Sequence, residues 1–123
     1  MRSSLLLVLV ALLGAAGVIL AAVGAHLPGL ADDPLRYRSW QSASLIHLVH
    51  VPVLLLLALQ DRSGWRAPAW AMLAGVLAFS GSIYAAGLVG QARPGPIAPI
   101  GGMLLIGSWL WLAVAGWRAS ARG

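Results

Sequence analysis

The sequence predicts an all-α membrane protein, in which four transmembrane helices form one bundle over residues 1–123 with both termini on the same side. The first indication is composition: 60% of the 123 residues are hydrophobic and 9% are charged. Soluble domains are roughly 45–50% apolar and about 25% charged. The second indication is a set of four uncharged runs, which cover residues 5–25, 45–59, 67–90 and 94–116. A helix needs about 20 apolar residues to cross the hydrocarbon core, and the second run reaches that length with uncharged residues 39–44.

The first helix is expected at residues 5–26. This segment also has features of a signal peptide, since Arg2 precedes the apolar stretch 5–13 and small residues follow at 21–25. The apolar run is longer than the 7–15 residues or so of a signal-peptide core. Its length therefore favours a membrane span over a cleaved leader.

The second helix is expected at residues 35–59. Asp33 followed by Pro34 is typical of an N-cap and a first helical residue. Within the span, Pro52 cannot donate a backbone hydrogen bond, and its ring clashes with the carbonyl of Leu48. The sequence therefore predicts a kink at Pro52, with the Leu48 carbonyl bonded to a water or a neighbouring serine.

The third helix is expected at residues 67–90 and the fourth at residues 95–117. Proline is favoured in the first turn of a helix, so Pro68 is expected to begin the third helix, and Pro96 or Pro99 the fourth. Turn-forming pairs precede both helices. They are Ser63–Gly64 and Pro94–Gly95.

Small residues at helical spacing predict where the helices touch. Burial of apolar surface does not drive association within lipid, so small residues that allow close backbone approach are favoured at helix contacts. The candidates are Gly14, Gly17, Ala21 and Gly24 in the first helix, Ala74, Ala78, Ser82 and Ala85 in the third, and Gly101, Gly102 and Gly107 in the fourth. Tight packing is one interpretation of these residues, and a glycine-lined pathway is the other.

The arginines predict orientation and exclude some partners. Five of them, Arg2, Arg62, Arg66, Arg118 and Arg122, fall on the side of the termini, against Arg36, Arg38 and Arg93 on the other. The positive-inside rule then places both termini in the cytoplasm. Arginines at helix ends favour anionic lipid as a partner, and no arginine-rich stripe suggests nucleic acid.

Polar residues inside the spans gather in the non-cytoplasmic half when they are placed by the helical rise of about 1.5 Å per residue. These candidate site residues are His26, Gln41, His47, His50, Ser80, Ser82 and Tyr84. An ionisable side chain is costly within hydrocarbon, so it is a functional-site hypothesis by default. His47 and His50 are three residues apart and share one helix face.

Three interpretations of the histidine pair stay open. The pair could be neutral and hold helices together through hydrogen bonds to Ser80, Ser82 or Tyr84. It could line a polar pocket for a lipid headgroup, quinone or small solute, or serve as a proton-sensitive element. It could also bind metal or haem, although the spans have no carboxylate and the chain has no cysteine. A hydrolase is disfavoured because no Gly-x-Ser-x-Gly motif occurs.

Five short motifs occur in a familiar order. They are Gly24–His26, Trp40–Gln41, His47 with His50, Phe79–Tyr84 and Pro96–Gly102. Together they resemble the domain of unknown function 423 family, the YgdD-like small integral membrane proteins, over about residues 14–112. The resemblance implies a four-helix inner-membrane protein with no established activity. The family usually has Ala-Leu-Ala-Leu after the second histidine, where this chain has residues 51–54, Val-Pro-Val-Leu, so the proline kink is expected to be particular to this protein.

The predicted function is a non-enzymatic structural or interaction role, with no catalytic residue, bound metal or cofactor. The expected partners are membrane lipids and either a second copy or another membrane protein. One alternative is a binding or transport module that uses the histidine, serine and tyrosine pocket. The second alternative is a haem- or metal-binding redox subunit.

Overall fold

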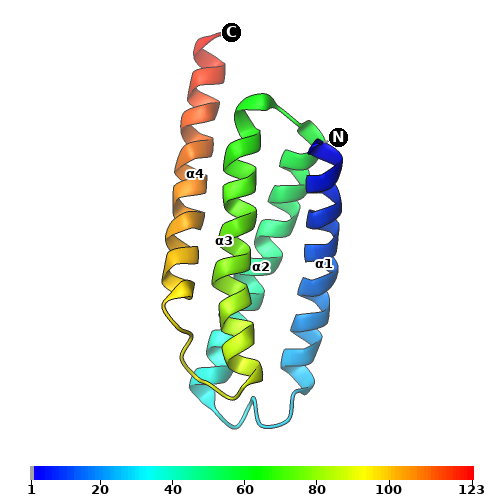
Figure 1. Ribbon diagram of the computed structural model, residues 1–123, viewed down its shortest axis with the longest axis vertical. Coiled ribbons are helices and arrows are strands. Elements are labelled where there is room, and N and C mark those ends of the chain that lie inside the picture. Colours follow the sequence, from blue (N-terminus) through cyan, green and yellow to red (C-terminus); the bar gives the residue numbers. More distant parts are fainter. Residues whose placement is uncertain (1) are drawn as a thin grey trace.

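Four long helices make up the computed structural model, which describes residues 2–123. They are α1 (Arg2–His26), α2 (Pro34–Gln60), α3 (Ser63–Leu88) and α4 (Ile97–Ala121). The helices alternate in direction, so α1 begins and α4 ends at the same end of the bundle (Figure 1). All four are long and apolar enough to cross a membrane. The predicted all-α bundle of four transmembrane helices is confirmed.

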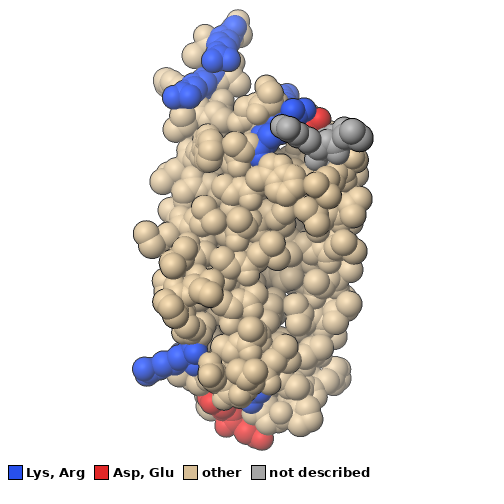
Figure 2. All heavy atoms as spheres, in the orientation of Figure 1, with Lys and Arg blue, Asp and Glu red and all other residues tan. Residues whose placement is uncertain are grey.

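Charged side chains lie at the two ends of the bundle, and a wide band between them is uncharged on the face shown in Figure 2. Large apolar side chains on the outer surface of this band are more than half exposed, among them Leu12, Leu56 and Ile106. A soluble monomer rarely exposes an apolar surface of this extent. The band therefore matches a helix bundle surrounded by lipid.

The central helix of the bundle is α3, which packs against α4 on one side and α2 on the other (Figure 1). α1 packs mainly against α2 and has a smaller contact with α3. The outer helices α1 and α4 have the least buried spans, and α3 has the most buried one. The outer helices therefore supply much of the surface available to lipid.

Two clusters of buried apolar residues divide the interior along its length. The aliphatic core lies toward the end with the termini and consists of Leu6, Val10, Leu13, Leu54, Leu57, Ala58, Ala69, Met72, Leu73, Val76 and Leu105. The aromatic core lies toward the other end and consists of Leu30, Trp40, Ala43, Ile83, Tyr84 and Ala98. The buried histidines, His47 and His50, lie near the junction of the two cores.

The start of α3 corrects the sequence prediction. The helix begins at Ser63 and not at residue 67, so Ser63 and Gly64 are helical and do not form the expected turn. The connection is shorter because Asp61 takes the left-handed conformation (φ 44°), and its N–H bonds to the Leu57 carbonyl. Pro68 is then inside the helix, where it leaves the Gly64 carbonyl without its usual partner. Gly64 is exposed at the end of the bundle, which makes this carbonyl accessible to water.

The other helix boundaries differ from the sequence by a few residues. α1 already begins at Arg2, and α4 begins at Ile97, directly after Pro96, and continues to Ala121. Asp33 accepts hydrogen bonds from two backbone N–H groups of the first turn of α2, each at 3.1 Å, and therefore caps this helix as its sequence predicts. α2 stays helical through Pro52.

Candidate functional site

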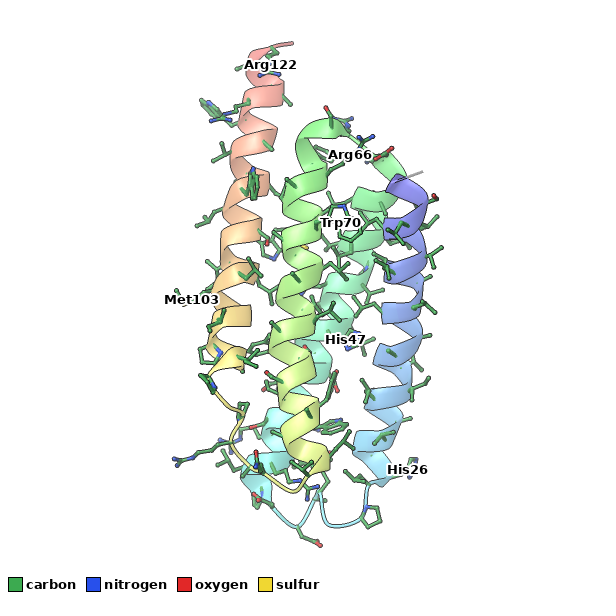
Figure 3. All side chains as sticks on the ribbon, in the orientation of Figure 1. His26, His47, Arg66, Trp70, Met103 and Arg122 are labelled. Atoms are coloured by element: carbon green, nitrogen blue, oxygen red, sulfur yellow. The ribbon has the colours of Figure 1, made fainter. Side chains whose placement is uncertain are left out.

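His47 connects three helices from the interior of α2, where its side chain is 3% exposed (Figure 3). Its Nε2 lies 2.8 Å from the carbonyl oxygen of Leu13 in α1, and its Nδ1 lies 3.1 Å from the hydroxyl of Tyr84 in α3. A carbonyl oxygen only accepts hydrogen bonds, so Nε2 carries a proton and donates it. In the neutral ring, Nδ1 then accepts from Tyr84.

The hydroxyl of Tyr84 extends this hydrogen-bonded chain to Ser44, whose Oγ is 3.4 Å away. Tyr84 has one proton to donate, and the state of His47 decides where it goes. With neutral His47, Tyr84 donates to Nδ1 and Ser44 can donate to Tyr84. With charged His47, Nδ1 donates to Tyr84 and Tyr84 donates to Ser44. Both arrangements tie α1, α2 and α3 together.

His50 connects α2 to α4. Its Nδ1 lies 2.6 Å from the carbonyl of Ile46, one turn earlier, and its Nε2 accepts from the indole N–H of Trp109 at 3.1 Å. The two rings are tilted by 59° with centroids 5.9 Å apart. Because the indole only donates and the carbonyl only accepts, both nitrogens are satisfied by the neutral Nδ1–H form alone.

The serines of the interior are bonded to backbone carbonyls. Ser80 Oγ in α3 donates to the carbonyl of Ala43 in α2 at 2.8 Å, and Ser108 Oγ donates to Leu104 within α4 at 2.7 Å. Among the side chains that the structure describes, those of residues 4–123, every buried nitrogen or oxygen has a hydrogen-bond partner. The buried polar layer is thus satisfied by the protein itself.

The structure brings four of the seven candidate residues into this buried layer, namely His47, His50, Ser80 and Tyr84. The other three lie elsewhere. His26 is exposed at the end of α1 and points away from the bundle (Figure 3). Ser82 is half-buried and bonds within its own helix, to the Phe79 carbonyl at 2.9 Å. Gln41 is exposed on α2, because its position in the helical turn faces away from α3.

Trp40 explains why glycine is needed at two helix contacts. Its indole is 2% exposed, donates to the Leu20 carbonyl at 2.9 Å and lies between α1 and α3. A methyl group added at Gly24 of α1 would overlap the indole, and one added at Gly87 of α3 would lie 2.7 Å from its Cε3. Only residues without a side chain leave room for this tryptophan.

The remaining glycines predicted for packing differ in how closely they are approached. A methyl group at Gly17 would lie 3.2 Å from Nε2 of His47, so this glycine opens the path to the Leu13 carbonyl. A methyl group at Gly101 would overlap the α3 backbone at Phe79, which allows α4 to approach closely. A methyl group at Gly14 would lie 3.3 Å from Cγ1 of Val51, and one at Gly102 would make only an ordinary contact with the Phe79 ring. The prediction was wrong for Gly107, where a methyl group would meet nothing within 4 Å.

Two important residues were not identified from the sequence. Trp109 of α4 donates to His50 of α2, and no pattern in the sequence pairs these two residues, which are 59 positions apart. Arg36 donates through Nε, at 2.8 Å, and through Nη2 to the carbonyl of Gly87 at the end of α3. A cation there satisfies a terminal carbonyl and interacts favourably with the helix dipole. The sequence does contain a signal for the Arg36 contact. Arg36 is in the first turn of its span, and the following helix ends at the same depth in the membrane.

A groove of about 290 Å³ opens between α1 and α2, in the half of the bundle that holds the aromatic core. It is lined by Ala21, Gly24, Ala25, Tyr37, Trp40, Gln41 and Ser44. A smaller apolar hollow of about 120 Å³ lies beside His47 and Tyr84. The described chain has no group of three side chains arranged to hold a metal ion.

Comparisons with known proteins agree on one family. The family model described as Protein of unknown function (DUF423) matches residues 20–102. The UPF0382 membrane protein YwdK of Bacillus subtilis is 33% identical over 114 residues, which cover 85% of this chain and 92% of the relative. A UPF0382 membrane protein of Haemophilus influenzae is 34% identical over 120 residues, which cover 94% and 95%. A third, from Schizosaccharomyces pombe, is 30% identical over 113 residues, which cover 85% and 94%. No solved structure matches.

Proposed function

The chain belongs to the DUF423 family of membrane proteins of unknown function, and from this premise we propose that it has a non-enzymatic structural or interaction role. One observation carries the proposal: the four ring nitrogens of His47 and His50 all bond to fixed groups of the protein. A catalytic or metal-binding histidine needs a nitrogen that can reach substrate or metal. Here the nitrogens link helices.

The proposed location is the inner (plasma) membrane, with both termini in the cytoplasm. The excess of arginine on the side of the termini supports this orientation. The proposed partners are membrane lipids and either a second copy or another membrane protein. The broad apolar surfaces of α1 and α4 support this choice, since they are the least covered helices.

Alanine substitution of each histidine tests the structural role. We expect His47→Ala and His50→Ala each to lower the free energy of unfolding by at least about 0.6 kcal/mol, the average measured for one hydrogen bond between helices in a membrane protein, because each substitution removes two hydrogen bonds, at least one of them between helices. His26→Ala is the matched control, since His26 is exposed, and it should leave stability unchanged. Unfolding is measured in lipid nanodiscs by circular dichroism.

The same purified protein tests the non-enzymatic assignment against a redox role. We expect no Soret band in its visible spectrum and no metal at one equivalent per chain by elemental analysis. A bound haem or a stoichiometric metal that is lost in His47→Ala or His50→Ala would contradict the proposal, because the ring nitrogens would then be ligands.

A further inference from the structure

The groove between α1 and α2 has a polar wall and an apolar floor. Tyr37, Gln41 and Ser44 line it from α2, and α1 contributes small side chains, Ala21 and Ala25, which leave the space open. The indole of Trp40 forms its inner boundary, and the indole nitrogen is already bonded to the Leu20 carbonyl. The groove therefore offers hydrogen-bonding groups on one side and a hydrocarbon surface on the other.

Two of these polar groups differ from every polar group in the interior. Among the described residues, neither the Gln41 amide nor the Tyr37 hydroxyl has a hydrogen-bond partner in the protein, whereas the buried polar atoms are all paired. At the edge of the hydrocarbon core, such groups are satisfied by partners from outside the protein, which are water or the polar groups of a lipid.

The depth of the groove indicates which molecule that partner is. α2 has 27 residues and is about 40 Å long at a rise of about 1.5 Å per residue, so it exceeds the roughly 30 Å hydrocarbon core. Tyr37 and Gln41 are within the first two turns after Pro34, which places them at the boundary between headgroups and hydrocarbon. The ester and phosphate oxygens of phospholipids lie at this boundary, and they are acceptors for amide and hydroxyl protons.

The size of the groove favours part of a lipid over other occupants. Its volume of about 290 Å³ lies at the lower limit of the roughly 300–1,000 Å³ of pockets that enclose a whole small molecule. A helix of a second chain, about 10–12 Å wide with its side chains, does not fit into it. A lipid needs to place only its glycerol-ester region and the start of one acyl chain there, because the rest remains in the bilayer.

We propose that the groove between α1 and α2 is a binding site for one glycerophospholipid. Gln41 and Tyr37 donate hydrogen bonds to its ester or phosphate oxygens, and one acyl chain lies over Ala21 and Ala25. Ser44 at the inner end connects this site to the chain through Tyr84 to His47. The inference goes beyond the proposed structural role, since it assigns a specific lipid contact to named side chains.

Native mass spectrometry of the full chain tests the site, with palmitoyl-oleoyl phosphatidylethanolamine added to delipidated protein. We expect one lipid bound per wild-type chain. The double variant Tyr37→Phe with Gln41→Leu should bind about tenfold more weakly, as the loss of two hydrogen bonds predicts. Ala25→Leu fills the groove without removing a polar group and should weaken binding similarly.

The control is Ser42→Ala, which removes a hydroxyl at the same depth outside the groove lining and should bind as wild type. Equal binding by wild type, the double variant and Ala25→Leu would overturn the proposal, as would the absence of any retained lipid in wild type. If the double variant does not fold, Ala25→Leu decides alone, because Ala25 is exposed and a larger residue there is expected to leave the helix contacts unchanged. A dimer that Ala25→Leu disperses would assign the groove to a second copy and refute the lipid site.

Discussion

At the scale of single residues, the two histidines differ in which nitrogen carries the proton. His47 donates from Nε2 to a carbonyl of another helix, whereas His50 donates from Nδ1 to a carbonyl of its own helix. The remaining nitrogen of each ring pairs with an aromatic side chain, Tyr84 or Trp109. The two rings are three residues apart on α2, but His47 links α2 to α1 and α3, whereas His50 links α2 to α4.

This difference predicts two distinct tautomers. In the neutral protein, His47 is expected as the Nε2–H form and His50 as the Nδ1–H form, because each carbonyl requires a donor. Nitrogen-15 NMR of histidine-labelled protein in lipid distinguishes the two forms, and His47→Ala and His50→Ala provide the assignments. Identical tautomers at the two sites would contradict the geometry described above.

Trp109 is predicted to stabilise the bundle through its indole nitrogen. Trp109→Phe keeps most of the ring but removes the donor, which leaves Nε2 of His50 unpaired, so the free energy of unfolding should fall by about 1 kcal/mol. Trp111→Phe is the control, because this neighbouring tryptophan is also exposed and its indole nitrogen has no hydrogen-bond partner among the described residues. Equal losses in the two variants would assign the effect to ring size and not to the bond with His50.

At the scale of helices, glycines determine how closely α1 and α3 approach Trp40 of α2. Gly87→Ala is expected to destabilise the bundle by about 1–3 kcal/mol, the typical cost of overpacking a filled interior, and Gly24→Ala should act in the same direction. Gly107→Ala in α4 is the control, since a methyl group there meets open space. Unfolding in nanodiscs measures all three. A loss for Gly107→Ala as large as that for Gly87→Ala would show that a general property of glycine, and not contact with Trp40, causes the effect.

The helices could be predicted because hydropathy over about 20 residues is a local property of the chain. The start of α3 was missed because Pro68 is a typical first-turn residue, and the sequence does not show that Asp61 turns the chain early. For the candidate site, the depth of each side chain in the membrane was predictable from the helical rise. The direction in which each side chain points was not. Gln41 faces the outer groove while His47, six residues later, faces the interior, and only the packed helices determine this.

Partners in the site also depend on contacts between distant segments. The bonds of Trp109 to His50 and of Arg36 to Gly87 connect residues 59 and 51 positions apart. Neither follows from periodicity, because the first depends on how α2 and α4 meet beside α3 and the second on how α2 packs against α3. The sequence therefore identified the polar residues of the spans but did not show which of them form hydrogen bonds with one another.

At the scale of the whole molecule, the arginines are divided unequally between the two ends of the bundle. Arg66 and Arg122 mark the end where α1 begins and α4 ends (Figure 3), and by sequence this end carries five of the eight arginines. At the opposite end, Arg36 is bonded to the Gly87 carbonyl, so one of its three arginines is engaged by the protein. On the side of the termini, Arg66 is paired in turn with Asp61, its Nε 2.7 Å from Oδ1, so each end has an arginine held by the protein and the excess of two on this side is unchanged.

This asymmetry predicts that both termini are cytoplasmic. A fluorescent reporter fused after Gly123 should be active, because it folds in the cytoplasm, and alkaline phosphatase at the same position should be inactive. Phosphatase inserted in the α3–α4 connection at residues 91–95 is the control and should be active.

Replacing Arg118 and Arg122 by alanine reduces the arginines on the side of the termini from five to three, equal to the other side, and should produce a population of chains with mixed orientation. Active phosphatase after Gly123 in the unaltered chain would reverse the assignment and place the lipid groove in the cytoplasmic leaflet.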